Sequence, residues 1–308
     1  MVHIPVLQKE VLQCLEPKPN ENFIDCTIGE GGHGLAILET IRPRGKLLGI
    51  DWDSENIRRL KAKIQNLKLQ KRLILVNDNF ANLKEIVKRE RFQSISGILF
   101  DLGMSSWHLA ESGRGFSFLR NEPLDMRYDL RNPLTAEKIV NFWSEPDIEK
   151  ILKEFGEENF AEAIARTLIE ERRFGPIKTT FQLVKIVKKA VPLRYQHPGP
   201  PERQRRLHCA TRTFQAIRIA VNEELENLKK ALPQAVEILR PEGKLLVISF
   251  HSLEDRIVKT FFKNYTGPTR VNLRILTKKP IIPSEKEIKI NPRSRSGKLR
   301  AAVKICPK

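Results

Sequence analysis

Three glycines in the segment DCTIGEGGHG, residues 25–34, have the spacing of a nucleotide-binding turn. Gly29, Gly31 and Gly34 match the G-x-G-x-x-G pattern, in which the backbone holds the pyrophosphate of a dinucleotide. The spacing alone is a weak signal, because any tight turn between a strand and a helix favours glycine where φ is positive or the backbone approaches a ligand. The residues around the turn must therefore distinguish between ligands.

Carboxylates surround this turn. Asp25 precedes it and Glu30 lies inside it. A pyrophosphate is an anion that binds at a helix N-terminus, so nearby carboxylates oppose it. S-adenosylmethionine (AdoMet) carries a sulfonium and an ammonium group beside its carboxylate, so the same acids favour it. The local charge favours AdoMet over NAD.

Further polar and aromatic residues stand at the ends of the next predicted strands. Asp51 ends the second strand, where a carboxylate accepts ribose hydroxyls in either kind of cofactor site. Asp78 and Phe80 follow the third strand and are candidates to flank an adenine ring. Asp101 ends the fourth strand and is expected to face the crevice where open α/β sheets bind ligands. Each carboxylate alone is as easily a solvated strand end, but their repetition predicts a site at this edge.

The elements that must position these residues follow an alternating pattern. Short β-branched runs alternate with helical periodicity, which is typical of a parallel α/β sheet. One helix is expected at residues 54–64, with Ser54 as its N-cap. Two final strands are expected at 271–279 and 300–306, which completes a doubly wound, Rossmann-like sheet of seven strands. The first five strands are expected at residues 22–29, 46–51, 72–78, 97–103 and 244–250.

The alternation stops between the fourth and fifth strands, where helical patterns follow one another. Amphipathic stripes predict helices in SEPDIEKILKEF, NFAEAIARTLIEERR and TTFQLVKIVKKAV. A long helical pattern then runs from Thr211 to Leu239, with Pro233 as an expected kink. The expected domain bounds are residues 1–104 with 208–308 for the sheet domain and 105–207 for the helical insert.

The chain carries a strong positive charge. Its 308 residues include 55 Lys and Arg against 37 Asp and Glu, a formal net charge of +18. Such a surface attracts polyanions, which favours nucleic acid or an anionic membrane as a partner. No stretch approaches the roughly 20 apolar residues of a membrane span, so a soluble, cytoplasmic protein is expected. The cysteines, at 14, 26, 209 and 306, and the histidines lack metal-ligand spacing, so no metal is expected.

Basic and aromatic residues indicate how a nucleic acid is held. Two basic clusters flank the expected cleft, and such clusters neutralise phosphates. Trp107, Phe116 and Phe118 either stack on a base or belong to the core, and their periodicity does not decide between the two. The clusters comprise Arg203, Arg205, Arg206, Arg212 and Arg218 beside the insert, and Arg293, Arg295, Lys298 and Arg300 near the end of the chain.

Several longer motifs, in order along the chain, resemble those of one family. The chain is similar to the MraW-type 16S rRNA cytosine-N4 methyltransferases in the segments HIPVL, DCTIGEGGHG, GIDWD, DLGMSS, RGFSF, PLDMR, ATRTFQAIRI, SFHSLEDRIVK and NPRSRSGKLR. The resemblance implies a class I AdoMet methyltransferase with a helical insert, whose partner is 16S rRNA in the small ribosomal subunit. It leaves open whether the chain forms a homodimer.

Two other functions compete with this one. An NAD-dependent oxidoreductase shares the glycine spacing but gains nothing from acids beside its pyrophosphate. A non-catalytic RNA-binding protein explains the basic clusters but predicts a degraded cofactor loop, whereas Gly29, Gly31, Gly32 and Asp51 are all present. Only the methyltransferase uses both features.

The resemblance also implies the cofactor contacts. A glutamine of the family corresponds to His108 in this chain, and an imidazole can also donate or accept a hydrogen bond. Cys209 stands where a proline is usual. The remaining contacts fall on Gly31, Gly32, His33, Asp51, Phe80 and Asp101.

The implied reaction needs a proton acceptor. The exocyclic amine of cytosine is a poor nucleophile because its lone pair is delocalised into the ring, so the site must align the amine and accept its proton. The candidate acceptors are Asp101, Ser105 and Asp125. Asp125 is also a candidate for a purely structural role, tying the insert to the sheet domain.

Overall fold

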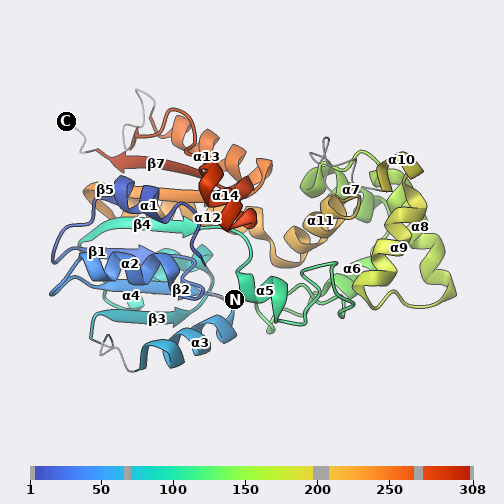
Figure 1. Cartoon of the computed structure of the whole chain (residues 1–308), viewed down its shortest axis with the longest axis horizontal. Helices are drawn as coiled ribbons and strands as arrows, with labels where there is room; N and C mark the ends of the chain where they lie inside the picture. Colours follow the sequence, from blue (N-terminus) through green and yellow to red (C-terminus); the bar gives the residue numbers. More distant parts are fainter. Residues whose placement is uncertain (1–3, 66–68, 70, 197–207, 267–272, 306–308) are drawn as a thin grey trace. The chain divides into compact units, whose positions relative to one another are not determined.

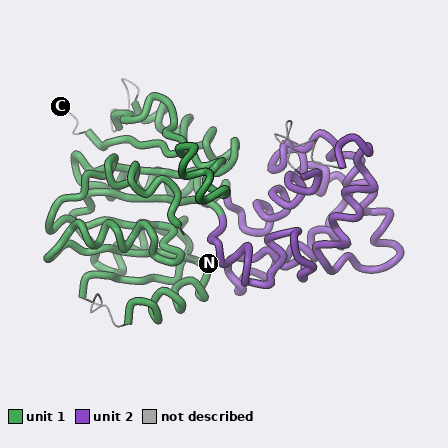
Figure 2. Tube along the Cα trace, in the orientation of Figure 1, with its two compact units in different colours: residues 1–103, 225–308 green, residues 104–224 purple. Residues whose placement is uncertain are grey.

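The computed structural model describes residues 4–65, 69, 71–196, 208–266 and 273–305 (Figure 1). The chain forms two compact units, one of Met1–Gly103 with Leu225–Lys308 and one of Met104–Glu224 (Figure 2). We describe each unit by itself.

Unit 1 is built on a seven-stranded sheet with the order β3-β2-β1-β4-β5-β7-β6, which confirms the predicted α/β class. The first five strands are parallel, and β7 lies antiparallel between β5 and β6. The strand order reverses between β1 and β4, the kind of switch point where open α/β sheets bind ligands. The strands are β1 (Asn22–Asp25), β2 (Leu47–Asp51), β3 (Leu73–Asn77), β4 (Ile95–Asp101), β5 (Leu239–Ser249), β6 (Leu273–Ile275) and β7 (Lys298–Lys304).

Helices cover both faces of this sheet (Figure 1). Successive strand residues point to opposite faces, so Phe23 packs in one core and Ile24 in the other, as do Leu99 and Ile98. This alternation buries both faces, as a parallel sheet requires. The helices of unit 1 are α1 (Gln8–Leu15), α2 (Gly32–Thr40), α3 (Ser54–Ile64), η2 (Phe80–Asn82), α4 (Leu83–Arg89), α13 (Ser252–Asn264), α14 (Glu285–Ile290) and η5 (Pro292–Ser296), with nearly all of α12 (Glu224–Ile238).

The start of α3 differs from the prediction by one residue. Asp53, not Ser54, is the N-cap, and its carboxylate accepts a hydrogen bond from the Glu55 amide at 2.9 Å. The Asp53 amide in turn donates to Asp51 at 2.9 Å. The carboxylate that ends β2 therefore fixes the position of the cap, which the local pattern of α3 does not reveal.

Unit 2 consists mainly of helices, and the three predicted insert helices are confirmed as α7, α8 and α9. Buried apolar residues such as Ile148, Ile164 and Leu183 line their inner faces. Among the described residues, no helix is both long and apolar enough to cross a membrane. The helices of unit 2 are α5 (Ser106–Ala110), α6 (Ala136–Phe142), α7 (Glu145–Gly156), α8 (Ala161–Glu171), η3 (Arg172–Phe174), α9 (Thr180–Ala190), α10 (Leu193–Gln196) and α11 (Thr211–Asn222).

The long helix expected from Thr211 to Leu239 is two helices, α11 and α12, and the interruption lies at Glu223, before Pro233, where a kink was expected. The helical conformation is interrupted at Glu223, which adopts a left-handed conformation with φ of 49° and ends α11. Pro233 lies inside α12. The break also places α11 in unit 2, where it packs against α7. The second boundary between the units therefore falls after Glu224 instead of after residue 207.

Candidate functional site

Three neighbouring strands of unit 1 each end in an aspartate. Asp25, Asp51 and Asp101 are the last residues of β1, β2 and β4, and β1 lies between the other two strands. Parallel strands present their carboxyl ends at one edge, so the three carboxylates gather there. Their side chains differ in access, because Asp25 is 1% exposed and the side chain of Asp101 is 19% exposed.

His33, in the first turn of α2, faces Asp101 at this edge. Its Nε2 lies 3.5 Å from Asp101 Oδ2, and the imidazole is buried. Within the described residues, His33 Nδ1 and Asp101 Oδ1 have no hydrogen-bond partner, although both atoms are buried. Buried polar atoms without partners are rare in folded proteins and indicate a place for a ligand with its own donors and acceptors.

Thr27 connects Asp25 with Asp101, and the sequence analysis missed it. Its hydroxyl accepts a hydrogen bond from the Asp101 amide at 2.7 Å. Its amide donates to Asp25 Oδ1 at 3.1 Å. The only sequence signal for this role is the position of Thr27 two residues after the strand-ending aspartate.

Burial and neighbouring charges shift the pKa values of the ionisable side chains at this edge. Burial raises the pKa of the Asp25 carboxyl to about 7, against a smaller lowering by His33. Burial likewise raises the pKa of Asp51 to about 7. Burial lowers the pKa of the His33 imidazole, but Asp101 and Asp25 together offset this, so its pKa is raised. A ligand with positive groups gains from such a site when the acids are ionised.

Asp51 anchors the glycine turn. Its Oδ2 accepts hydrogen bonds from the Gly29 amide at 2.9 Å and from Asn56 Nδ2 at 3.2 Å, and its Oδ1 accepts one from Asp53. A carboxylate has about four acceptor positions, so roughly one remains for a ligand hydroxyl. Asp51 therefore both shapes the turn and stays able to bind.

The glycines of the turn are explained by the protein around them. Gly31 has a φ of 83°, which side chains rarely adopt, and a Cβ there would lie 2.7 Å from Leu60. A Cβ on Gly32 would lie 2.4 Å from Pro5. The sequence left open whether positive φ or a nearby ligand requires these glycines, and in the structure the backbone conformation of Gly31 and the packing of Pro5 on Gly32 already do.

Residues 4–8 cover the glycine turn. Besides the contact of Pro5 with Gly32, Gln8 Nε2 donates a hydrogen bond to the Gly32 carbonyl at 2.9 Å. The Leu7 amide donates to Glu287 Oε1 at 2.8 Å, which ties this segment to α14. No local pattern predicts these contacts, because their partners lie far away in the sequence.

Phe80 and Asp78, at the end of β3, are already engaged by the protein. Phe80 is 7% exposed, and its ring centroid lies 5.9 Å from that of Trp52 and 5.5 Å from that of Phe100. Asp78 pairs with Arg89 at 3.2 Å. The Phe80 ring thus belongs to the hydrophobic core of unit 1, close to the carboxyl end of β3.

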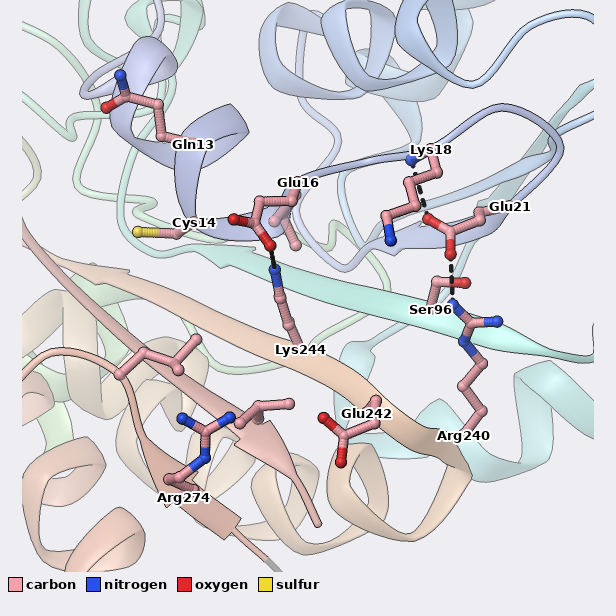
Figure 3. Close-up of a pocket in the computed structure, with 13 residues that line it drawn as sticks. Gln13, Cys14, Glu16, Lys18, Glu21, Ser96, Arg240, Glu242, Lys244 and Arg274 are labelled. Atoms are coloured by element: carbon pink, nitrogen blue, oxygen red, sulfur yellow. Dashed lines mark hydrogen bonds and ion pairs between the residues drawn. The ribbon is translucent and has the colours of Figure 1, made fainter. Parts of the chain in front are cut away.

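A separate cavity of about 420 Å³ lies at the opposite, amino-terminal edge of the parallel strands (Figure 3). Its charged side chains pair across it, Glu16 with Lys244 at 2.5 Å and Glu21 with Arg240. The predicted cofactor residues do not line it. The cavity is therefore distinct from the strand-end cluster, the group of Asp25, His33, Asp51 and Asp101 at the carboxyl ends of the strands.

Ser105 and His108 cap helix α5 in unit 2. The Ser105 hydroxyl lies 3.0 Å from His108 Nδ1 and accepts a hydrogen bond from the His108 amide at 3.3 Å. The imidazole is buried among the rings of Trp107, Phe116 and Tyr128, at centroid distances of 5.2, 5.1 and 4.9 Å. Trp107 and Phe116 therefore belong to the core of unit 2.

Phe118 makes a different set of contacts. Its ring stacks on His208 at a centroid distance of 4.7 Å and meets Phe214 edge-on at 5.3 Å. It therefore joins the loop after α5 to α11.

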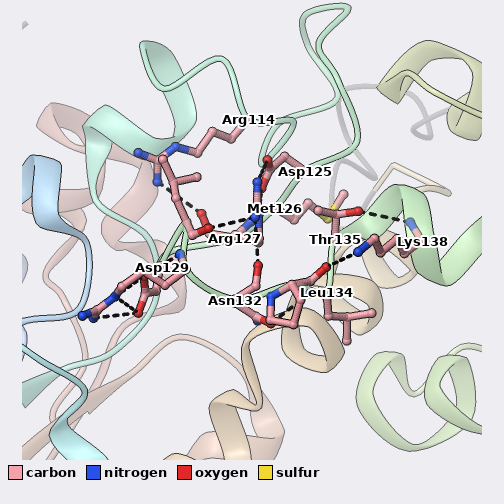
Figure 4. Close-up of polar contacts among 12 residues, drawn as sticks. Arg114, Asp125, Met126, Arg127, Asp129, Asn132, Leu134, Thr135 and Lys138 are labelled. Carbon is pink, nitrogen blue, oxygen red and sulfur yellow. Dashed lines mark hydrogen bonds and ion pairs between the residues drawn. The ribbon is translucent and has the colours of Figure 1, made fainter.

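Asp125 is held by its neighbour Arg127 (Figure 4). Arg127 Nε and Nη2 donate to the two carboxylate oxygens of Asp125, both at 2.8 Å. Arg127 also donates to the carbonyls of Leu130 and Asn132. The pair orders the loop before α6 within unit 2, so these contacts do not tie the insert to the sheet domain.

The basic clusters separate into paired and unpaired residues. Arg218 is buried and makes two 2.8 Å hydrogen bonds to Glu224, so it does not face a phosphate as expected. Arg300 is likewise buried and paired with Asp255, at 2.7 and 3.2 Å. Arg212 donates to the carbonyl of Glu157. Arg203, Arg205 and Arg206 lie outside the described residues.

Comparison with known proteins gives a consistent picture. Residues 1–305 match the profile of the MraW methylase family. Two curated relatives from Clostridium botulinum, strains Kyoto / Type A2 and 657 / Type Ba4, are each 43% identical over 316 aligned positions. The alignments cover 98% of this chain and 99% of each relative, and both relatives are named ribosomal RNA small subunit methyltransferase H.

Proposed function

Because the chain belongs to the MraW methylase family, we propose that it methylates the exocyclic N4 amine of a cytosine in the 16S rRNA of the small ribosomal subunit, with AdoMet as the methyl donor. The name of the two relatives supports the RNA substrate. The observation that carries the proposal is the cluster of Asp25, His33 and Asp101, with its buried, unpartnered polar atoms at the carboxyl edge of the sheet.

The strand-end cluster fits AdoMet. Two buried polar atoms without partners, His33 Nδ1 and Asp101 Oδ1, and the acids beside them suit a ligand with an ammonium, a sulfonium and a carboxylate. When bound, AdoMet supplies an electrophilic methyl group. We assign its binding to Gly31, Gly32, His33, Asp51, Phe80 and Asp101 of unit 1, whereas the buried imidazole of His108 packs inside unit 2.

Asp101 is the proton acceptor of the proposed reaction. It is more exposed than the other carboxylates of the cluster, and one of its oxygens has no hydrogen-bond partner in the described structure. The hydrogen bond to Thr27 holds its backbone, and His33 orients its other oxygen. A fixed acceptor aligns the amine and removes its proton, which contributes about 10²- to 10⁴-fold in rate.

Ser105 and Asp125 take structural roles in this proposal. The Ser105 hydroxyl caps α5, and both oxygens of Asp125 accept hydrogen bonds from Arg127. Since both oxygens of Asp125 are occupied by the guanidinium, neither is free to accept a proton from the amine. We therefore assign proton acceptance to Asp101 alone.

The two units have different roles in the proposed reaction. Unit 1 binds the cofactor, and unit 2 takes part in recognising the RNA, in the cytoplasm where ribosomes assemble. An oxidoreductase does not explain the acids beside the glycine turn, and a non-catalytic RNA-binding protein does not explain why the strand-end cluster is intact. Neither alternative agrees with membership of a methylase family.

The test is a transfer assay with isotopically labelled AdoMet and unmodified small ribosomal subunits, followed by digestion to nucleosides and mass spectrometry. Label is expected in N4-methylcytidine. Asp101→Asn should reduce the rate by about 10²-fold or more at saturating AdoMet, the condition that separates loss of the proton acceptor from weaker cofactor binding. Asp147→Asn, an exposed residue of α7, serves as the control and should keep the wild-type rate. Label in another nucleoside, or undiminished transfer by Asp101→Asn, would contradict the proposal.

A further inference from the structure

We propose that Arg293 and Arg295 are direct contacts to phosphates of the RNA substrate, whereas Arg300, in the same basic cluster, has a structural role. This inference rests on the proposed function and identifies the surface of unit 1 that holds the substrate. It starts from the short helix η5, in which both arginines lie.

The conformation of η5 turns both arginines outward. Ser294, between them, has 0% exposure, and its hydroxyl donates to the Asn291 carbonyl at 2.8 Å. The Ser294 amide donates to the same carbonyl, and the Gly297 amide donates to Ser294. Because the central residue is fixed inward, its two neighbours are both exposed.

The two guanidinium groups are not neutralised by the protein. Among the described residues, neither Arg293 nor Arg295 has a hydrogen-bond or ion-pair partner. Arg300 differs, since Asp255 accepts two hydrogen bonds from it, and Lys298 lies 3.7 Å from the same carboxylate. A cation without a partner can release counterions when it meets a phosphate, whereas a paired one is already compensated.

The position of η5 relates it to the strand-end cluster. Ile248 of β5 pairs with Asp101 on one side and with Leu299 of β7 on the other. Leu299 therefore lies two strand spacings, roughly 10 Å, from the backbone of Asp101. Arg295 stands only a few residues before Leu299, so η5 lies on the same edge of the sheet as the proposed acceptor.

The segment that covers the glycine turn also braces η5. A Cβ on Gly297 would lie 2.9 Å from Val6, and Asn291 Nδ2 donates to the Ile4 carbonyl at 3.1 Å. The arginines therefore lie on an element that residues 4 and 6 help to hold in place, next to the glycine turn. This placement suits phosphates that flank a base entering the site, since phosphate contacts fix the register of a nucleic acid.

The experiment compares the salt dependence of binding for the full-length wild type and for Arg293→Ala/Arg295→Ala. The probe is an unmodified transcript of 16S rRNA, and filter binding is measured over a series of KCl concentrations. We expect the double variant to bind roughly tenfold or more weakly at low salt. The slope of log affinity against log salt should fall by about 1 to 2. AdoMet affinity should stay unchanged.

Two matched variants sharpen the result. Arg293→Lys/Arg295→Lys keeps the charges and should keep most of the slope. Arg44→Ala/Lys46→Ala removes two exposed cations at the opposite edge of the sheet and should bind like the wild type. An Arg293→Ala/Arg295→Ala protein with the wild-type slope overturns the inference. If the wild type itself neither binds the transcript nor methylates small subunits, the proposed function fails instead.

Discussion

At the scale of single residues, two carboxyls of the strand-end cluster have raised pKa values, so the unbound protein keeps them protonated at acidic pH. The pKa of Asp25 and that of Asp51 are each raised to about 7 by burial, whereas an exposed aspartate has a value of 3.8. Both carboxyls are therefore largely neutral below pH 7 and become negative above it. Positive groups of a bound cofactor favour the negative form.

This charge predicts how AdoMet affinity depends on pH. Between pH 6 and pH 8 the affinity of the wild type should rise, by about tenfold for one carboxylate gained. Asp25→Asn removes one of the titrating groups, so its affinity should rise less steeply. Calorimetric titration at several pH values measures both profiles, and Asp147→Asn should keep the wild-type profile. Identical profiles for the wild type and Asp25→Asn would show that Asp25 does not titrate at the site.

The same substitution should act on the stability of the unbound protein. A carboxyl whose pKa is raised on folding binds more protons in the folded than in the unfolded state between about pH 4 and pH 7, so its contribution to stability falls as the pH rises through this window. Asp25→Asn lacks this loss and should unfold at a higher temperature than the wild type at pH 8.

The sequence identified most of these residues but not their partners. Asp51 and Asp101 could be placed because they follow β-branched runs, and parallel strands end at one edge. The contacts of Pro5, Gln8 and Glu287 could not be predicted, since they depend on tertiary packing between distant segments. The pairing of Arg300 was hidden for the same reason.

At the scale of elements, hydrophobic period was more informative than individual turn and cap residues. All seven predicted strands are present in the structure, because each was predicted from a short run of consecutive apolar residues. The break between α11 and α12 was missed, since Glu223 is an ordinary helix former and its residue type does not reveal the left-handed conformation. Pro233, the expected kink, is accommodated within α12.

The conformation of Glu223 yields a stability prediction. Glycine adopts a φ of 49° without the steric cost that a side chain incurs, so Glu223→Gly should stabilise the protein by roughly 0.5 to 1 kcal/mol. Lys230→Gly, at an exposed position inside α12, should cost about 1 kcal/mol. Urea unfolding of both variants measures the difference. Equal destabilisation by the two glycines would contradict a left-handed residue at this point.

At the scale of the whole molecule, the structure separates a sheet unit from a helical unit that interrupts its sequence. The existence of the insert was predicted from the change in periodicity, while its second boundary was not. Helix α11 has the same amphipathic pattern whichever unit it packs against, so periodicity cannot assign it.

The division into units predicts where AdoMet slows amide hydrogen exchange. At about 100 times its dissociation constant, a ligand stabilises the state that binds it by about 2.7 kcal/mol. We expect slower exchange in residues 25–33 and 4–8 of unit 1, with unchanged rates in α7, α8 and α9 of unit 2. NAD at the same concentration is the control and should leave every rate unchanged. Slowing confined to unit 2 would argue against the proposed cofactor residues.

The hydrogen bond between Leu7 and Glu287 has a consequence for folding during translation. It joins residues 280 positions apart, and it fastens the segment that covers the glycine turn. Translation releases a chain from its amino end, so Leu7 emerges long before its partner exists. The segment gains its bond to α14 only when that helix has left the ribosome, and a nascent chain that stops earlier must hold the cover by the contacts of Pro5 and Gln8 with Gly32.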